Sequence, residues 1–353
     1  MKQLVAVAPR KAALVDIDGG TTGPQQARVK VTHASPKHGS ELAAFRNESP
    51  HRNEYYDEAW RAFLPREKPD DREGPFGAWN LGNQWVGIVT EVGAEVTDYA
   101  VGDRVCGYGG IREEHLVRAV DNYYLKKMPS GMSWKNAVCF DPAQFALGGV
   151  RDSGLRLGDA VAVIGLGAIG QLAAQMAKLA GASYVAVVDP IELRREAALR
   201  HGADAAFDPN ASDVGLELKK ATGKRGVDVV IETSANEFAL QQALRGVAYG
   251  GTIAYVGWAR PFRGGMDWGK EAHFNNAKIV FSRACSEPNP DHPRWSWRRI
   301  EDECWALLSA SKLQCEDIVY PVVPLEEAAS GYETYVDRRP ELSIKLGVDL
   351  TGL

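Results

Sequence analysis

The sequence predicts a two-domain protein, an α/β plus β fold in which a doubly wound parallel sheet is inserted into a β-rich domain. The chain has 353 residues, which is too long for one ordinary domain and suits two. Residues 1–147 show short alternating apolar runs broken by turns, whereas residues 148–285 alternate strand and helix patterns. Residues 286–353 return to mixed structure, and we expect this tail to complete the first domain.

Composition excludes several classes of protein. The net charge of −5 provides no basic surface for nucleic acid, and no run of about eighteen apolar residues could span a membrane. The N-terminal segment 1–7 is too short for a signal peptide and has the pattern of a first strand. The five cysteines are odd in number and contain no Cys-x-x-Cys pair. We expect free thiols in a reducing cytoplasm, with neither nucleic acid nor membrane as a partner.

In the first domain, alternating apolar residues predict strands at 27–31 and 87–92, and a turn at 102–105 leads into a further strand. The segment 47–80 is polar and contains several prolines. We therefore expect most of it to form a long loop with one helical turn near residues 55–63. Loops of this length are usually functional or disordered.

The second domain contains the most informative segment of the chain. A buried-strand pattern at 161–164 runs without a gap into the glycine-rich turn 165–170, and a helix pattern follows at 171–180. A second apolar strand at 184–188 ends in Asp189. Strand, glycine turn, helix, strand and acid in this order predict a dinucleotide-binding βαβ unit. The alternative is a glycine turn that serves packing alone.

The residues of this turn have separate predicted roles. Gly165 allows the tight turn, Gly167 lets the backbone approach a pyrophosphate, and Gly170 lets the helix pack closely on the strand. Ala168 and Ile169 lie at the helix N-terminus, where unpaired N–H groups and the helix dipole favour phosphate. We therefore expect this turn to bind the phosphates of the cofactor.

Asp189 indicates which dinucleotide is bound. It lies nineteen residues past Gly170, where a carboxylate can accept both hydroxyls of the adenosine ribose and would repel a 2′-phosphate. We therefore predict NAD as the cofactor. Arg194 and Arg195 follow shortly afterwards, and an arginine there could also bind a phosphate, so NADP remains the alternative.

The rest of this domain continues the alternation of strands and helices. Such alternation implies a parallel sheet with helices on both faces and right-handed crossovers. The further strands are expected at 228–232, 252–256 and 278–282, and the further helices at 192–201, 213–222 and 237–247. In the tail, amphipathic patterns predict helices near 299–309 and 325–336.

These features together resemble the medium-chain dehydrogenase/reductase superfamily, and most closely its polyol branch of sorbitol- and threonine-dehydrogenase-like proteins. The resemblance is carried by the turn at 102–105, the glycine turn 165–170, the strand 226–232 and the closing strand 343–346. It implies a GroES-like β-barrel catalytic domain with an inserted Rossmann domain, and an active site in the cleft between them. It also implies a homodimer or homotetramer, often paired through the edge strand near 279–283.

The sequence departs from this superfamily at the positions of its catalytic zinc ligands. Where zinc-dependent members have Cys-Gly-Ser/Thr-Asp, this chain has His38-Gly39-Ser40-Glu41, and Gly82-Asn83-Gln84 replaces their Gly-His-Glu. Asp141 occupies the region of the third ligand, and the cysteines of the structural zinc lobe are absent. Because amides are weak donors to zinc, we predict a zinc-free site. The alternative is a rebuilt metal site that uses His38, Glu41 and Asp141.

Without a metal, a side chain must take the proton of the substrate hydroxyl as hydride leaves. His38 could do so near neutral pH, and Lys37 could do so if burial beside the cationic nicotinamide favoured its neutral form. By resemblance, the hydroxyl of Ser40 relays this proton. The alternative is that Lys37 is a solvated loop cation and His38 a hydrogen-bonded loop histidine.

The substrate and nicotinamide sites complete the prediction. Amide and carboxylate groups suit several hydroxyls, and a tryptophan at a strand end suits the C–H face of a sugar or cyclitol, although such groups can also satisfy one another. The predicted substrate-binding residues are Glu41, Asn83, Gln84, Asp141, Gln144 and Trp258. By resemblance, the nicotinamide contacts the ends of the last parallel strands, at Thr233, Ser234, Ala235, Val256, Gly257, Ser282, Arg283 and Ala284, and Arg194 belongs to the cofactor site.

We therefore predict an NAD-dependent oxidoreductase that interconverts a secondary alcohol and a ketone on a sugar, glycoside, polyol or cyclitol without zinc. One rival is a zinc-free reductase of enones or quinones, which would usually prefer NADPH and is disfavoured by Asp189. A second rival is a catalytically silent NAD-binding sensor, to which the loss of metal ligands gives some support.

Overall fold

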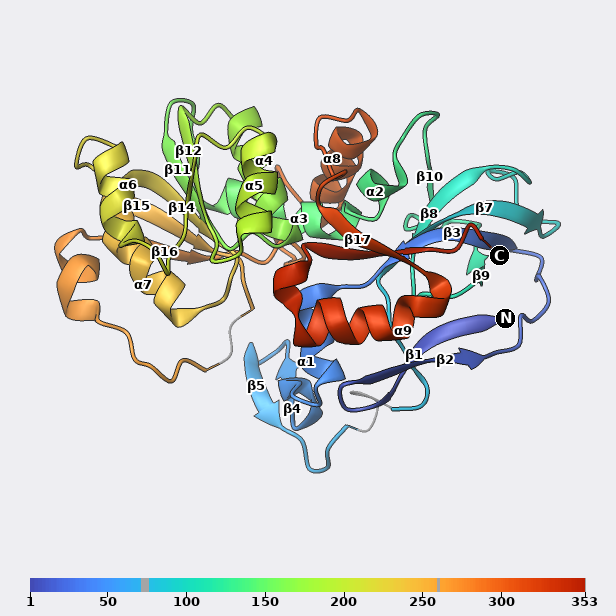
Figure 1. The fold of residues 1–353 in the computed structure, drawn as a ribbon. Coiled ribbons are helices and arrows are strands. Elements are labelled where there is room, and N and C mark those ends of the chain that lie inside the picture. Colours follow the sequence, from blue (N-terminus) through green and yellow to red (C-terminus); the bar gives the residue numbers. More distant parts are fainter. Residues whose placement is uncertain (71–75, 259–260, 353) are drawn as a thin grey trace. The chain divides into compact units, whose positions relative to one another are not determined.

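The computed structural model forms two compact units, Met1–Trp134 with Tyr320–Leu353, and Lys135–Val319 (Figure 1). In these units the boundaries lie after Trp134 and Val319, whereas the sequence predicted them after residues 147 and 285. The difference arises because α3 (Phe140–Asp152) packs on α4 (Ala168–Leu179), and α8 (Trp297–Ser309) packs on α3. The described residues are 1–70, 76–258 and 261–352, apart from the side chains of Ser40 and Pro50.

The second unit is built on a parallel sheet that has six strands among the described residues. Strand β11 is central and the strand order reverses between β11 and β14, which is the doubly wound arrangement that binds ligands beyond the carboxyl ends of its strands. The predicted fold class is confirmed. In spatial order the strands are β13 (Ala205–Phe207), β12 (Tyr184–Val188), β11 (Ala160–Ile164), β14 (Val227–Glu232), β15 (Val247–Tyr255) and β16 (Lys278–Phe281).

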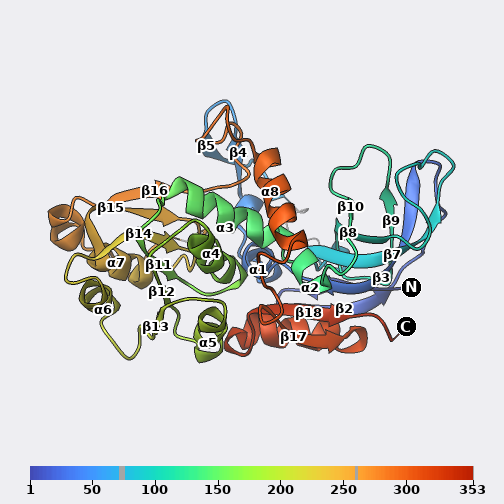
Figure 2. The same cartoon turned by 90° about the horizontal axis from the view of Figure 1, so that it is seen from above.

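Helices pack against this sheet (Figure 2). The two helices α6 (Val214–Ala221) and α7 (Glu237–Gly246) pack against Ala162, Val230 and Ile253, whereas α3 and α4 contact each other and the strands β15 and β11. The remaining elements are α5 (Glu192–Arg200) and the short π-helical turn η2 (Trp268–Ala272). The predicted helices are present within three residues of their expected ends. Strand β13 was not predicted, because three half-buried residues carry no periodic pattern.

The first unit is antiparallel β structure of the GroES-like type. Its larger sheet runs β10 (Lys126–Lys127), β8 (Arg104–Tyr108), β7 (Gln84–Val92), β3 (Gln26–Ser35), β18 (Lys345–Asp349) and β17 (Val319–Pro324), and β9 (Glu114–Arg118) also pairs with β3. A smaller sheet contains β2 (Lys11–Asp16), β1 (Lys2–Ala8) and β6 (Trp79–Asn80). Strand β18 pairs with β3 in the register Val348 to Ala34, so the end of the chain completes the sheet of the first unit.

Three segments of the first unit differ from the prediction. The expected helical turn near 55–63 is wrong, because β4 (Glu54–Asp57) and β5 (Ala62–Pro65) form a hairpin there after the short turn η1 (Pro50–Arg52). The helix α1 (His38–Phe45) was not predicted. The expected tail helix is a succession of 3-10, α and π turns, η3 (Leu325–Glu327), α9 (Ala328–Gly331) and η4 (Tyr332–Arg338), followed by η5 (Pro340–Leu342). The short helix α2 (Trp134–Ala137) contains the position in the chain at which the first unit ends and the second begins.

Across the described ranges, no helix combines the length and apolar composition that crossing a bilayer requires. The five cysteines are free thiols, and four of them are buried.

Candidate active site

The glycine turn of the second unit has geometry that only glycine can adopt at two positions. Gly165 has a φ of +88°, and a Cβ added there would lie 2.7 Å from the backbone nitrogen of Ser234. A Cβ on Gly170 would lie 1.8 Å from the carbonyl oxygen of Gly165. These two glycines therefore permit the close approach of α4 to the ends of β11 and β14.

Gly167 differs from its neighbours because a Cβ there would meet no described atom within 4 Å. It is the N-cap of α4, and as a glycine it has no side chain that could cap the amides of Ala168 and Ile169, which begin the helix. This helix N-terminus therefore has both the open space and the N–H donors that a pyrophosphate needs. A dinucleotide fits the turn.

Asp189 is fastened to the glycine turn at the end of β12. Its Oδ2 accepts the N–H of Leu166 at 2.7 Å and its Oδ1 accepts the N–H of Ile191 at 2.9 Å, and the residue is 4 % exposed. Arg194 Nη1 lies 3.9 Å from Oδ2. Arg195 donates to the Asp189 carbonyl at 2.7 Å and pairs with Asp208 at 3.3 Å. Arg195, one of the two arginines that could bind a 2′-phosphate, is thus bonded within the protein.

The end of β14 contains an acid that sequence reasoning missed. The carboxylate of Glu232 accepts the N–H groups of Ser234 and Ala235, at 2.8 and 3.1 Å, and also the Ser234 hydroxyl. Burial raises the pKa of Glu232 to about 7, although the bonds from Ser234 and Ala235 oppose this shift. Thr233 donates its hydroxyl to the Gly165 carbonyl at 2.7 Å. These residues therefore shape the turn between the two halves of the sheet.

The remaining predicted cofactor residues follow β15 and β16 at the same edge of the sheet. A Cβ on Gly257 would lie 2.8 Å from the backbone nitrogen of Ala235, so the chain after β15 passes close to the end of β14. Trp258 comes next and is 50 % exposed. Ser282 donates its N–H to the Tyr255 carbonyl at 2.9 Å, and Arg283 and Ala284 follow it.

In the first unit, His38 is the first residue of α1 and Lys37 is its N-cap. The N–H of Leu346 donates to Nε2 of His38 at 2.9 Å. Nε2 is therefore an acceptor, and the neutral ring carries its hydrogen on Nδ1. His38 could take a substrate proton on Nε2 only by giving up this bond. Ser40 lies in α1, but its side chain is outside the described atoms.

Glu41 joins the two segments that replace the zinc-ligand motifs. Its Oε2 accepts the N–H of Gly82 at 3.0 Å. Burial raises the pKa of Glu41 to about 7, and nearby Tyr332, the amides of Gly82 and Lys37 and the Lys345 ammonium oppose the shift. Glu41 Oε1 and the Tyr332 hydroxyl are buried, and neither has a partner of ordinary hydrogen-bond geometry among the described residues.

Asn83 and Gln84 follow Gly82 at the start of β7. The Asn83 backbone donates to the Ser35 carbonyl at 3.0 Å, whereas its side-chain Nδ2 is buried without a described partner. Gln84 is completely buried. Asp141 and Gln144 belong to α3 of the second unit, where Gln144 Oε1 accepts the Trp297 indole N–H at 3.0 Å. The joining of all four residues in one substrate site stays a prediction.

Comparisons with known proteins agree with this fold. A family model described as zinc-binding dehydrogenase matches residues 168–296. D-guloside 3-dehydrogenase of Escherichia coli (strain K12) is 56 % identical over 348 residues, which is 99 % of both chains. This chain belongs to the zinc-binding dehydrogenase family. The predicted medium-chain dehydrogenase/reductase superfamily is confirmed, and the protein is an oxidoreductase of the alcohol and polyol dehydrogenase type that uses a nicotinamide dinucleotide.

More distant relatives show the same architecture. (R,R)-butanediol dehydrogenase of Bacillus subtilis (strain 168) is 30 % identical over 62 % of this chain and 67 % of its own. The crystal structure of 2R,3R-butanediol dehydrogenase from Bacillus subtilis superposes with a TM-score of 0.74 at 22 % identity, covering 99 % of both chains.

Two side chains at the zinc-ligand positions of this dehydrogenase already accept hydrogen bonds from backbone amides. Among the described residues, no group of three or more His, Cys, Asp or Glu side chains is arranged to hold a metal ion. Nε2 of His38 accepts the Leu346 amide, and Glu41 Oε2 accepts the Gly82 amide. The donor set therefore favours a site of hydrogen-bonding groups over a cation site.

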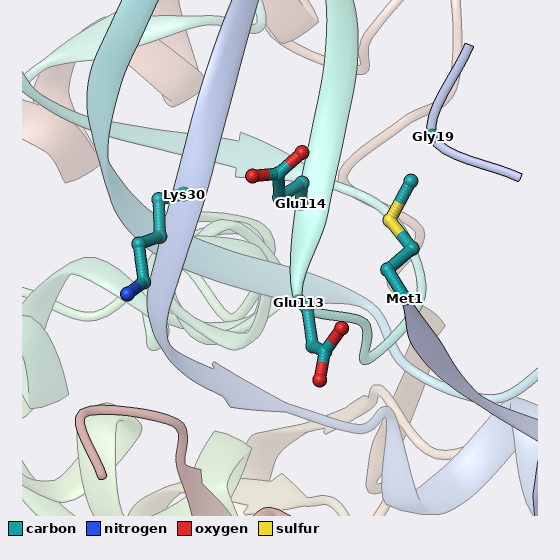
Figure 3. Close-up of a pocket in the computed structure, with 5 residues that line it drawn as sticks. All are labelled: Met1, Gly19, Lys30, Glu113 and Glu114. Atoms are coloured by element: carbon teal, nitrogen blue, oxygen red, sulfur yellow. The ribbon is translucent and has the colours of Figure 1, made fainter. Parts of the chain in front are cut away.

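A cavity of about 450 Å³ lies elsewhere on the first unit of the dehydrogenase (Figure 3). Its lining residues are Met1, Gly19, Lys30, Glu113 and Glu114. Glu113 accepts the backbone N–H of Lys2 at 2.8 Å, and Glu114 pairs with Arg28 at 3.0 Å. None of the described lining residues is a predicted site residue, so this cavity is not the candidate active site.

Proposed function

We propose that this dehydrogenase oxidises a secondary hydroxyl of a glycoside or related sugar to a ketone, with NAD as the oxidant and without zinc. The observation that carries the substrate class is the 56 % identity to D-guloside 3-dehydrogenase across the whole of both chains. The segments 37–41 and 82–84, joined by the bond between Glu41 and Gly82, supply hydroxyl-binding groups.

NAD is proposed over NADP because of the charge at the end of β12. A 2′-phosphate would lie beside the buried Asp189 carboxylate, while Arg195 is already bonded to Asp208 and to the Asp189 carbonyl. Arg194 lies against Asp189 and is proposed to line the same ribose site. We expect kcat/KM to be higher with NAD than with NADP.

When bound, the nicotinamide accepts the hydride that leaves the substrate carbon. The chain must therefore hold the substrate and remove the hydroxyl proton. The bond from Leu346 to His38 Nε2 favours Lys37 as the proton acceptor, with Ser40 as the relay implied by family resemblance. The proton passes to the Lys37 amine as the carbonyl forms, so charge and atoms balance.

Two buried polar atoms of the first unit are proposed to bind further substrate hydroxyls. Asn83 Nδ2 is a buried donor without a hydrogen-bond partner among the described residues, and Glu41 Oε1 is a buried acceptor on a carboxyl group that also interacts with the Tyr332 hydroxyl. A hydroxyl can serve both groups, since it donates and accepts. Gln84 and, from the second unit, Asp141, Gln144 and Trp258 remain proposed substrate residues.

A homodimer or homotetramer in the cytoplasm remains part of the proposal. Within the part of the chain that the structure describes, β16 pairs with β15 alone and forms an edge of its sheet, and Phe281 at its end is 78 % exposed. An unpaired edge with an apolar side chain can pair with a second copy of the chain.

The test is NAD reduction by purified protein on a panel of glycosides, free sugars, polyols and cyclitols, with metal analysis and chelation in parallel. We expect turnover on a glycoside, less than stoichiometric zinc, and activity that survives chelation. Turnover that requires stoichiometric zinc would contradict the metal-free site. NAD binding without turnover on any member of the panel would favour a silent sensor instead.

A further inference from the structure

One face of α3 holds the chain that leaves β16. Asp152 Oδ2 accepts the Ser282 hydroxyl at 2.6 Å, directly after the strand ends. Arg151, next to Asp152, forms an ion pair with Asp291 and lies 3.6 Å over the ring of Trp295. One end of the helix is thus joined by side chains to three residues of the segment 282–295.

The bond between α3 and Trp297 extends this attachment by a further two turns. Gln144 Oε1 accepts the Trp297 indole N–H at 3.0 Å, and Gln144, Gly148 and Asp152 are four residues apart on one helix face. A Cβ on Gly148 would lie 2.9 Å from the Cβ of Ala284. The absence of a side chain at Gly148 lets the helix press directly on the segment after β16.

The neighbouring strand end is held in the same way. A Cβ on Gly149 would lie 2.6 Å from a methyl group of Val256, which follows β15. Ser282 is 7 % exposed, and its N–H continues the ladder to the Tyr255 carbonyl. Ser282, directly after β16, is therefore held by its backbone N–H on one side and by the Asp152 carboxylate on the other.

The position of the bond between Asp152 and Ser282 relative to the sheet indicates its role. A doubly wound sheet binds one mononucleotide over each half, and Asp189 directs the adenosine to the half that contains β12. The nicotinamide then lies over β14, β15 and β16. Ser282, Arg283 and Ala284 leave β16 at that edge, where their backbone groups can meet the carboxamide.

We propose that Asp152 is a positioning residue for the nicotinamide half of the cofactor, acting through the Ser282 hydroxyl to fix the segment from Ser282 to Ala284. This inference rests on the proposed binding of a nicotinamide dinucleotide. Asp152 touches neither cofactor nor substrate in this role. Burial raises the pKa of Asp152 while the Ser282 hydrogen bond opposes the shift, so the two groups share a poorly hydrated site where their bond is strong.

The experiment compares two ligands, NAD and ADP-ribose, by calorimetric titration of the full-length protein. ADP-ribose contains the adenosine half without the nicotinamide ring. Asp152→Ala and Ser282→Ala should each lower the affinity for NAD about tenfold, while the affinity for ADP-ribose should change less than about twofold. Asp152→Asn should retain most of the NAD affinity, because its amide oxygen can accept the same bond. Glu303→Ala, an exposed acid on α8, is the matched control and should change neither affinity.

Circular dichroism of each variant identifies any loss of folding. If Asp152→Ala does not fold, Asp152→Asn and Ser282→Ala decide the question. Equal losses for both ligands, or unchanged NAD affinity in Asp152→Ala and Ser282→Ala, would overturn the positioning role alone. Wild-type protein that binds neither NAD nor ADP-ribose would overturn the proposed cofactor and the inference together.

Discussion

Leu346 donates its backbone N–H to Nε2 of His38 at 2.9 Å, which ties the last strand of the chain to the first turn of α1. Two further bonds strengthen the attachment. Lys345 Nζ donates to the Pro36 carbonyl at 2.8 Å, and the Ser35 hydroxyl donates to the Leu346 carbonyl at 2.6 Å. The segment that contains the candidate proton acceptor is therefore positioned by residues more than three hundred places away in the sequence.

This bond predicts different outcomes for two substitutions of His38. His38→Gln places an amide oxygen where Nε2 lies, so we expect kcat within about threefold of the wild type. His38→Ala leaves the Leu346 N–H without its partner and should cost about 1 kcal/mol of unfolding free energy and lower kcat. Steady-state kinetics and urea unfolding measure both effects. A complete loss of turnover in His38→Gln with unchanged stability would identify His38 as the base.

Lys37→Met should lower kcat by a factor on the order of 10² or more, because it removes the proposed proton acceptor but keeps the aliphatic side chain. Its affinity for NAD, measured by fluorescence titration, should stay unchanged. Lys11→Met, at an exposed position of β2 in the same unit, is the matched control. Wild-type kcat in Lys37→Met would rule out Lys37 as the proton acceptor.

The glycine turn predicts a contrast between two alanine substitutions. Gly170→Ala should lower the unfolding free energy by about 2 kcal/mol or more, because its Cβ would overlap the Gly165 carbonyl oxygen at 1.8 Å. Gly167→Ala should keep wild-type Tm, because its Cβ meets no described atom within 4 Å, yet weaken NAD about tenfold by occupying the space proposed for the pyrophosphate. Thermal unfolding and calorimetry separate the two effects. Unchanged NAD affinity in Gly167→Ala would place the phosphates elsewhere.

Two buried acids predict how stability depends on pH. The pKa of Glu41 and that of Glu232 are each about 7 in the folded protein, above their values in an unfolded chain. Between about pH 4.5 and 7 the folded state binds more protons than the unfolded state, so stability falls as pH rises through this window. Ionisation of each carboxyl can lower the free energy of unfolding by up to about 3 kcal/mol between pH 4.5 and pH 8.

Urea unfolding at pH 5 and pH 8 measures this dependence. Glu232→Gln and Glu41→Gln should each lose less stability than the wild type between these two pH values. Glu303→Gln provides a control with an exposed carboxyl. An undiminished loss in both buried-acid variants would mean that other groups carry the dependence.

The sequence alone predicts most strands and helices of the second unit, because each of them is encoded by residues that are neighbours in the chain. Each buried strand and amphipathic helix has its own period, and the turn from Gly165 to Gly170 uses residues that few other conformations require. One exception is the thirteen-residue helix α3, where no helix was predicted, and the others are short or mixed segments. Three residues are too few to define β13, and the short strands β4 and β5 have no alternating pattern that distinguishes them from an irregular loop.

Amino-acid types and their spacing by themselves determine the superfamily and the glycine turn, and they predict the acid that we propose binds the ribose. Tertiary structure alone decides that Nε2 of His38 faces an amide, that Glu41 bonds to Gly82, and that Asp152 holds Ser282. The physical reason is the distance along the sequence over which the deciding interactions act. A turn or a helix is determined by neighbours in the chain, whereas the protonation and orientation of a buried side chain depend on partners that only folding brings within 3 Å.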